Sequence, residues 1–224
     1  MSDKQDTREM LVSGNVFKTM LTLSVPAVLG MVVIGLYNFM DAVFVGQMVG
    51  PVAMTAVKVS YPFTLINSGI ATLIGQGSAS VLSRAIGERD KDTIDRIMGN
   101  LISFVTVLST LVIIFGLIFT RQLLTLAGAE GEVLEQAIPY LRVVFCGSLF
   151  VNLGQSTNMI MRGEGKLKKA MIIMATSAIL NIILDPILIK VFGAEKGVLG
   201  AAVATIVSQF VLMCMSFFYF IKKS

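Results

Sequence analysis

The sequence predicts an all-α membrane protein, a bundle of six transmembrane helices, and three observations lead to this prediction. Apolar residues make up 55% of the 224 residues and charged residues only 14%, against about 25% charged residues in an average soluble protein. Two stretches, 97–120 and 197–221, run for 24 and 25 residues without a charge, and about 20 apolar residues cross the hydrocarbon core. Four more long apolar stretches carry a single charge each, so a soluble globular domain is excluded.

The six expected spans follow one another with short polar connections. The four singly charged stretches are 20–49 with Asp41, 52–83 with Lys58, 136–161 with Arg142 and 170–189 with Asp185. We therefore expect a polar cytoplasmic N-terminus at 1–16, a six-helix membrane lobe at 17–221 and a cytoplasmic end at 222–224. The spans are expected at about 17–47, 52–83, 97–120, 136–161, 170–191 and 198–221.

Each boundary has a local signal. Pro26 should kink the first span, and the tight turn at 49–51 separates it from the second. The charged loop 84–92 precedes the third span, and small and acidic residues at 127–132 precede the fourth. The basic loop 162–169 leads into the fifth span. The apolar run after the N-terminus is too long for a signal-peptide core, so we expect no cleaved leader.

The distribution of positive charge predicts the orientation. With a cytoplasmic N-terminus, 13 of the 18 basic residues fall on the inner side and 5 on the outer side. This matches the positive-inside bias and predicts that both termini are cytoplasmic. A basic stripe suited to nucleic acid is not visible. Cys146 and Cys214 both fall inside spans, where we expect small apolar packing residues and no disulfide.

Two acids deep in the spans are the strongest functional signal. Of the 14 carboxylates, only Asp41 and Asp185 lie well inside a span. An ionised carboxylate at a helix centre costs about 2.5–3.5 kcal/mol on insertion scales, so such residues usually serve a function. The alternative is a static, hydrogen-bonded acid that locks helix packing. Both acids lie roughly 9–12 Å from the outer end of their helices, so they could face one cavity.

Polar residues surround these acids in the predicted arrangement. Asn181 shares a helix face with Asp185, and the remaining cavity candidates are Tyr37, Asn38, Gln155, Asn158, Thr205 and Gln209. Carboxylates with an amide and a hydroxyl can coordinate Na⁺, here at Asp41, Asn181, Asp185 and Thr205, or can hold a proton. The chain has no histidine, so a proton relay must use carboxylates. For each Asn and Thr alone, interhelical hydrogen bonding is the alternative.

An ordered set of short motifs resembles the multidrug and toxic compound extrusion (MATE) transporters of the MOP superfamily. The resemblance covers essentially the whole chain. The motifs are Asp41-Ala-Val-Phe-Val-Gly46-Gln-Met-Val-Gly50, Ala56-Val57, Tyr61-Pro62, Gly75-x-Gly77-Ser78, Ser83-Arg84-Ala-Ile-Gly87, Arg162-Gly163-Glu-Gly165, Asn181-x-x-x-Asp185-Pro186-x-Leu188-Ile189 and Gly197-x-x-Gly200-Ala-Ala-x-Ala-Thr205.

The resemblance implies a transporter rather than an enzyme. Family members have two six-helix lobes around a cavity that opens to one side at a time, and they export organic cations and other amphipathic compounds in exchange for H⁺ or Na⁺. It implies an ion-coupling site at Asp41 and Asp185, supported by Asn158, Asn181 and Thr205, with a hinge at Pro26. No cofactor beyond the coupling ion is implied.

The implied partners are an organic solute or drug, membrane lipid and a second six-helix lobe, because this chain resembles the N-terminal lobe alone. That second lobe is either a missing C-terminal half or a second copy, and we expect truncation. The expected location is the cytoplasmic membrane of a bacterial cell, as a multi-pass protein.

Lys58 departs from the family pattern, which has a small or neutral residue there. It either snorkels outward or pairs with Asp41, and we expect snorkelling. Two other functions stay open: a flippase for lipid-linked precursors in the same superfamily, which usually needs cationic residues in the cavity, and a non-transporting membrane subunit or fragment.

Overall fold

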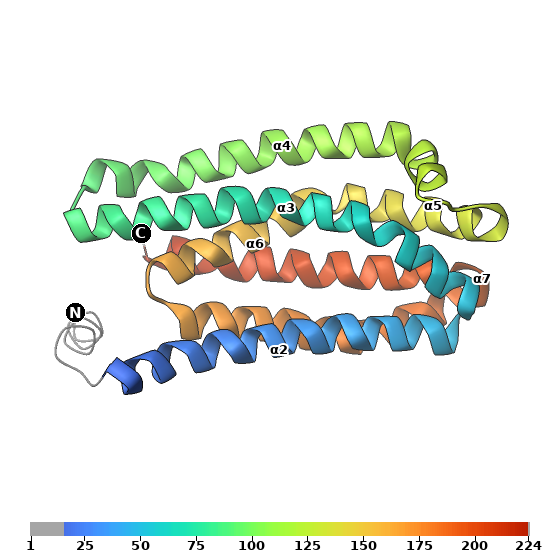
Figure 1. Ribbon diagram of the computed structural model, residues 1–224, viewed down its shortest axis with the longest axis horizontal. Coiled ribbons are helices and arrows are strands. Elements are labelled where there is room, and N and C mark those ends of the chain that lie inside the picture. Colours follow the sequence, from blue (N-terminus) through green and yellow to red (C-terminus); the bar gives the residue numbers. More distant parts are fainter. Residues whose placement is uncertain (1–15, 224) are drawn as a thin grey trace.

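The structure, a computed structural model, is a bundle of helices that run mainly along its long axis (Figure 1). It describes residues 16–223, and it describes the side chains of residues 24–222 except 26, 27, 31, 34, 38, 194 and 195. Nearly all of the predicted polar N-terminus lies outside the described residues. The helices are α2 (Val16–Met48), α3 (Pro51–Glu88), α4 (Lys91–Leu126), α5 (Gly131–Cys146), α6 (Ser148–Gly163) and α7 (Leu167–Lys223).

The last helix, α7, is two helices joined at Gly193. This glycine has φ 76° and ψ 172°, which no helical residue adopts, and glycine takes such left-handed φ values without a Cβ penalty. The two parts, Leu167–Gly193 and Lys196–Lys222, are each long and apolar enough to cross a membrane. They pack against each other as an antiparallel pair, since the backbone of Gly200 lies directly against that of Leu188.

Within the described part of the chain, length and composition qualify four helices as spans, and a fifth if α5 and α6 are counted together. The remaining helix, α3, has 38 residues and packs against α4, α5 and α6. Its mean hydropathy is too low to qualify it as a span by composition, because polar residues such as Ser60 and Asn67 lie on its buried face. The predicted all-helical membrane bundle is confirmed, and each predicted span lies within a helix or, for span four, across a bent pair. Where the membrane begins along each helix stays a prediction.

The predicted span at 136–161 falls across two helices that meet at a bend. The chain bends by 50° between α5 and α6, at the pair Gly147 and Ser148, and Gly/Ser pairs are a recognised cause of sharp kinks. Gly147 is buried, and a Cβ added there would lie 2.5 Å from Cγ1 of Ile206. A larger residue at this position would therefore displace the side chain of Ile206 in the second part of α7.

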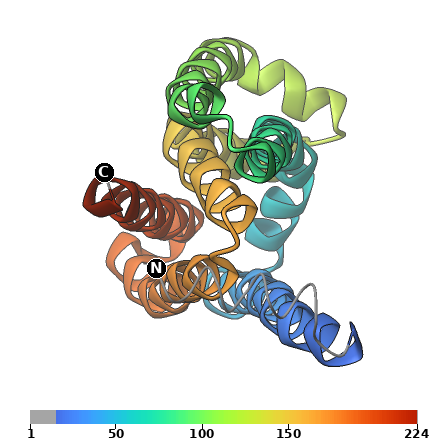
Figure 2. The ribbon, with the colours of Figure 1, turned by 90° about the vertical axis from the view of Figure 1, so that its left-hand side faces the viewer.

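The interior is unusually polar and the surface is apolar, as expected of a protein surrounded by lipid. In the end view, α6 lies between the α3–α4 side and the α7 side (Figure 2), and its Asn152 is fully buried. Nδ2 of Asn152 donates to Asn67 Oδ1 at 3.1 Å and to Ser109 Oγ at 2.9 Å. One amide thus joins α3, α4 and α6 where no water would satisfy these groups.

Two loops and two cysteines complete the description. Gly50 has φ 123° and precedes Pro51, the first residue of α3. At the start of α4, Asp90 accepts hydrogen bonds from the hydroxyl and backbone N–H of Thr93, and these bonds lower the pKa of the Asp90 carboxyl. Cys146 and Cys214 are free thiols on the bundle surface. Both lie in helices that correspond to predicted spans, and their side chains face outward rather than into the core.

Candidate functional site

Asp185 is the most deeply placed acid of the described bundle. It lies in the first part of α7 with an exposed fraction of 0%. Asn181, one turn earlier and 1% exposed, lies on the same helix face. Helical spacing alone brings these two side chains together, and the sequence predicted that they share a helix face.

The amide of Asn181 links Asp185 to the second part of α7. In the amide orientation that satisfies both ends, Nδ2 donates to Asp185 Oδ2 at 3.0 Å and Oδ1 accepts from the backbone N–H of Thr205 at 3.3 Å. The orientation is assigned from this hydrogen-bond network. The hairpin of α7 thereby gathers Asn181, Asp185 and Thr205 at one depth.

Asp41 approaches this group from α2, the helix that packs most extensively on α7. Its side chain is half-buried, and its Oδ1 is buried with no hydrogen-bond partner. Asp41 and Asp185 are close enough to interact electrostatically. A buried carboxylate oxygen without a partner is costly, so the pair offers a favourable position to a proton or a small cation.

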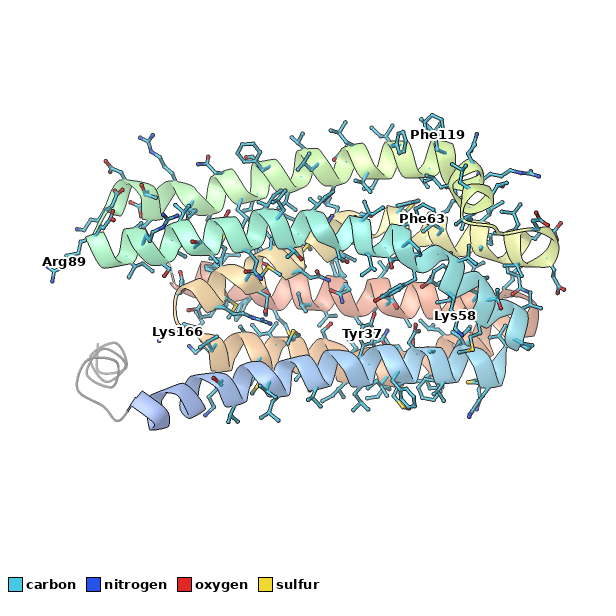
Figure 3. The ribbon with its side chains drawn as sticks, in the orientation of Figure 1. Tyr37, Lys58, Phe63, Arg89, Phe119 and Lys166 are labelled. Atoms are coloured by element: carbon cyan, nitrogen blue, oxygen red, sulfur yellow. The ribbon has the colours of Figure 1, made fainter. Side chains whose placement is uncertain are left out.

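Two tyrosines complete the cluster. Tyr37, one turn before Asp41, lies between α2 and α7 (Figure 3), interacts electrostatically with both acids and hydrogen-bonds with Thr205. Tyr140 of α5 also interacts with both acids and packs against the apolar cluster that contains Val45. Sequence reasoning missed Tyr140. The available signal was a tyrosine inside a predicted span, next to Pro139. A buried tyrosine hydroxyl usually needs a polar partner, so such a residue is a candidate for a polar site.

The structure does not bring every sequence-predicted residue to the acids. Nδ2 of Asn158 donates to the backbone oxygen of Ala170 at 2.9 Å. Ala170 is 15 residues before Asp185 in the same helix, which corresponds to about 22 Å. Asn158 therefore joins α6 to the start of α7, far from the acids.

Of the remaining candidates, Gln209 lies one turn beyond Thr205 and has a buried Oε1 without a hydrogen-bond partner. Gln155 is half-buried on α6, and in the described part of the chain it makes no hydrogen bond to either acid. The side chains of Pro26 and Asn38 lie outside the described residues.

Lys58 does not form an ion pair with Asp41. Its side chain is exposed on α3, near the end of the bundle that holds the α2–α3 turn (Figure 3). This placement agrees with a lysine that extends toward water rather than into the acid cluster.

The donor set of this acid cluster consists of oxygen atoms. Groups of three or more His, Cys, Asp or Glu side chains, the usual ligands of transition metals, do not occur in the described part of the chain. Two carboxylates with amide, hydroxyl and phenol oxygens remain, which are hard oxygen ligands. They fit a proton shared by the acids or a Na⁺ ion.

Comparisons with known proteins agree with this architecture. The MatE family profile matches residues 26–187. The multidrug export protein MepA of Staphylococcus saprophyticus is 32% identical over 210 residues, covering 94% of this chain and 46% of MepA. The chain thus spans about half the length of the curated relatives that it matches.

Two solved structures bear on the fold. A multidrug resistance MATE family transporter of the MOP superfamily in an outward-facing conformation is 34% identical, with a TM-score of 0.84 over 92% of this chain and 45% of that chain. A multidrug resistance MATE family transporter of the MOP superfamily in an inward-facing conformation, also 34% identical, gives a TM-score of 0.76 over 82% of this chain and 41% of that chain. With a profile match over most of its length, the chain belongs to the MatE family, whose members are membrane transporters and not enzymes.

Proposed function

We propose that this chain forms one lobe of an antiporter that exports amphipathic or cationic organic compounds in exchange for H⁺ or Na⁺. Asp41 and Asp185 bind the coupling ion, and Asn181, Thr205 and Tyr37 hold the two acids in place. The observation that carries the proposal is the acid pair itself. It lies between α2 and α7, with one carboxylate oxygen of Asp41 buried and unpartnered.

The ion and the solute compete through this pair. Two carboxylates that lie close together in an apolar interior are costly when both are ionised. Binding of H⁺ or Na⁺ relieves that cost, and so does a cationic solute near the same acids. A site that favours either one but not both produces exchange rather than co-transport.

A complete transporter needs a second body, and relatives of about twice this length support that requirement. Alternating access requires two bodies that move about one site. We propose that a second six-helix lobe, supplied by a C-terminal half or by a second copy, faces the side of the bundle with Asp41. Verified single chains, one per nanodisc or vesicle, should then fail to move solute.

The proposed setting is the cytoplasmic membrane with both termini inside. The 13 to 5 split of basic residues supports this orientation. MepA, an export protein of a bacterium, supports a bacterial cell membrane.

Transport in proteoliposomes tests the proposal. The two-lobed assembly is reconstituted, a pH or Na⁺ gradient is imposed, and movement of a fluorescent organic cation is followed. Wild type should accumulate the solute against its gradient, and Asp41→Asn and Asp185→Asn should not, because asparagine keeps size but exchanges no proton and brings no charge to Na⁺. Full gradient-driven transport in both variants would refute the site assignment. Movement of lipid-linked precursors without ion-driven solute transport would instead favour a flippase.

A further inference from the structure

An apolar groove between α3 and α4 lies outside the acid cluster and forms a second candidate site. It has a volume of about 590 Å³, within the range of about 300–1,000 Å³ typical of ligand sites. Its walls include Phe63, Ile66 and Ile70 from α3 and Phe115 and Phe119 from α4, with Phe145 of α5 at its base. Phe63 and Phe119 both lie toward the end of the bundle where α4 meets α5 (Figure 3).

The groove suits an uncharged hydrocarbon chain. None of its lining residues is charged, and Asn67 is the only polar one. The Oδ1 of Asn67 already accepts a hydrogen bond from Asn152 at 3.1 Å, so the base of the groove does not require a polar occupant. The rim is open to the bundle surface, because Ile66 is 68% exposed and Ile118 is 63% exposed. An occupant can therefore enter sideways from the hydrocarbon of the membrane.

A cation stands at one end of this groove. Ile114, Ile118 and Arg121 follow one another at spacings of four and three residues, so they lie on one face of α4. The two isoleucines line the groove, and Arg121 is exposed five residues before the end of α4 at Leu126. A guanidinium matches the geometry of a phosphate group. The groove with Arg121 is thus apolar along its length and positive at its end.

We propose that this groove binds one membrane phospholipid, with one acyl chain against the phenylalanine walls and the headgroup phosphate at Arg121. This lipid site is separate from the acid cluster between α2 and α7 and does not depend on the proposed transport activity. A bound lipid fills the space between α3 and α4 and so supports the packing of these two helices.

Native mass spectrometry of the purified chain in mild detergent tests the site. Phosphatidylglycerol with palmitoyl and oleoyl chains is added, and the lipid-bound and lipid-free populations are compared. Two variants alter the site: Ile70→Trp fills the groove, and Arg121→Gln removes the cation. Two matched controls leave it intact: Ile179→Trp on α7, where Ile179 is 57% exposed, and Arg142→Gln at an exposed position of α5.

Wild type and both controls should retain one phosphatidylglycerol, and both site variants should retain at least fivefold less. Diacylglycerol with the same chains should be retained several-fold less than phosphatidylglycerol by wild type. Equal retention of phosphatidylglycerol by all five proteins, or none by wild type, would overturn the site. The latter result would mean that protein rather than lipid covers the groove. Equal retention of diacylglycerol, or an unchanged Arg121→Gln, would overturn the phosphate assignment. Because Arg121 is exposed, Arg121→Gln keeps the proposal testable if Ile70→Trp fails to fold.

Discussion

Gly200 holds the two parts of α7 together at the depth of the acid cluster, so Gly200→Ala is an informative perturbation. A Cβ at this position would lie 2.6 Å from the backbone oxygen of Leu188, 2.7 Å from its carbonyl carbon and 2.8 Å from the nitrogen of Ile189. Backbone atoms cannot rotate away as a side chain can. The two helices must therefore separate, and Thr205 must move away from Asn181.

The expected loss of stability follows from two opposing effects. Overpacking a dense interior costs about 1–3 kcal/mol, and alanine in a helix gains about 0.5–1 kcal/mol over glycine. Gly99→Ala in α4 is the matched control, since a Cβ there meets nothing within 4 Å. The two variants should therefore differ in unfolding free energy by about 1–3 kcal/mol, which is the packing cost alone.

Unfolding by SDS in mixed micelles, followed by far-UV circular dichroism, measures this difference. Gly200→Ala should unfold at a lower SDS fraction than wild type, and Gly99→Ala at the same fraction or a higher one. If Gly200→Ala unfolds at or above the midpoint of Gly99→Ala, the close approach of the two parts of α7 is wrong.

Three further predictions concern the interior, the orientation and Lys58. Asn152→Ala should lower the unfolding free energy by about 1–3 kcal/mol for each of its two orphaned partners, measured in the same SDS titration; a loss no larger than that of the exposed control Ser103→Ala would contradict it. In a chain with Cys146 and Cys214 replaced, single cysteines at Glu88 and Gly165 should react with impermeant maleimide only from the cytoplasm and one at Glu130 only from outside, and the opposite pattern would reverse the topology. Lys58→Ala should leave the pH optimum of transport unchanged, because Lys58 is exposed, and a shifted optimum would indicate coupling to Asp41.

The fold was predictable because charge is scarce in this chain and its placement is therefore informative. Long uncharged stretches indicate spans whatever their neighbours are. Asp41 and Asp185 were recognisable for the same reason, since an acid inside a span has a high cost without a function. The contact between Asn181 and Asp185 followed from helical spacing alone.

The sequence could not predict the contacts that depend on how each helix is rotated and which helices it packs against. The sequence predicted that Asn158 lies near the acids. In the structure its amide donates to the backbone oxygen of Ala170, which lies about 22 Å from Asp185 along α7. Tyr140 reaches the acids because the bend at Gly147 sets the direction of α5, and nothing in its local sequence reveals that bend angle. The buried link from Asn152 to Asn67 and Ser109 likewise joins residues far apart in the chain.

The most direct test of the central claim runs the exchange in reverse. Vesicles that contain the two-lobed assembly are loaded with the organic cation and diluted into solute-free medium without an ion gradient. The efflux of solute should drive H⁺ or Na⁺ into the vesicles through wild type. Asp41→Asn and Asp185→Asn should release or exchange solute without any ion movement, because the carboxylates that bind the ion are gone. Solute-driven ion movement that persists in both variants at the wild-type rate would show that coupling does not occur at these two acids.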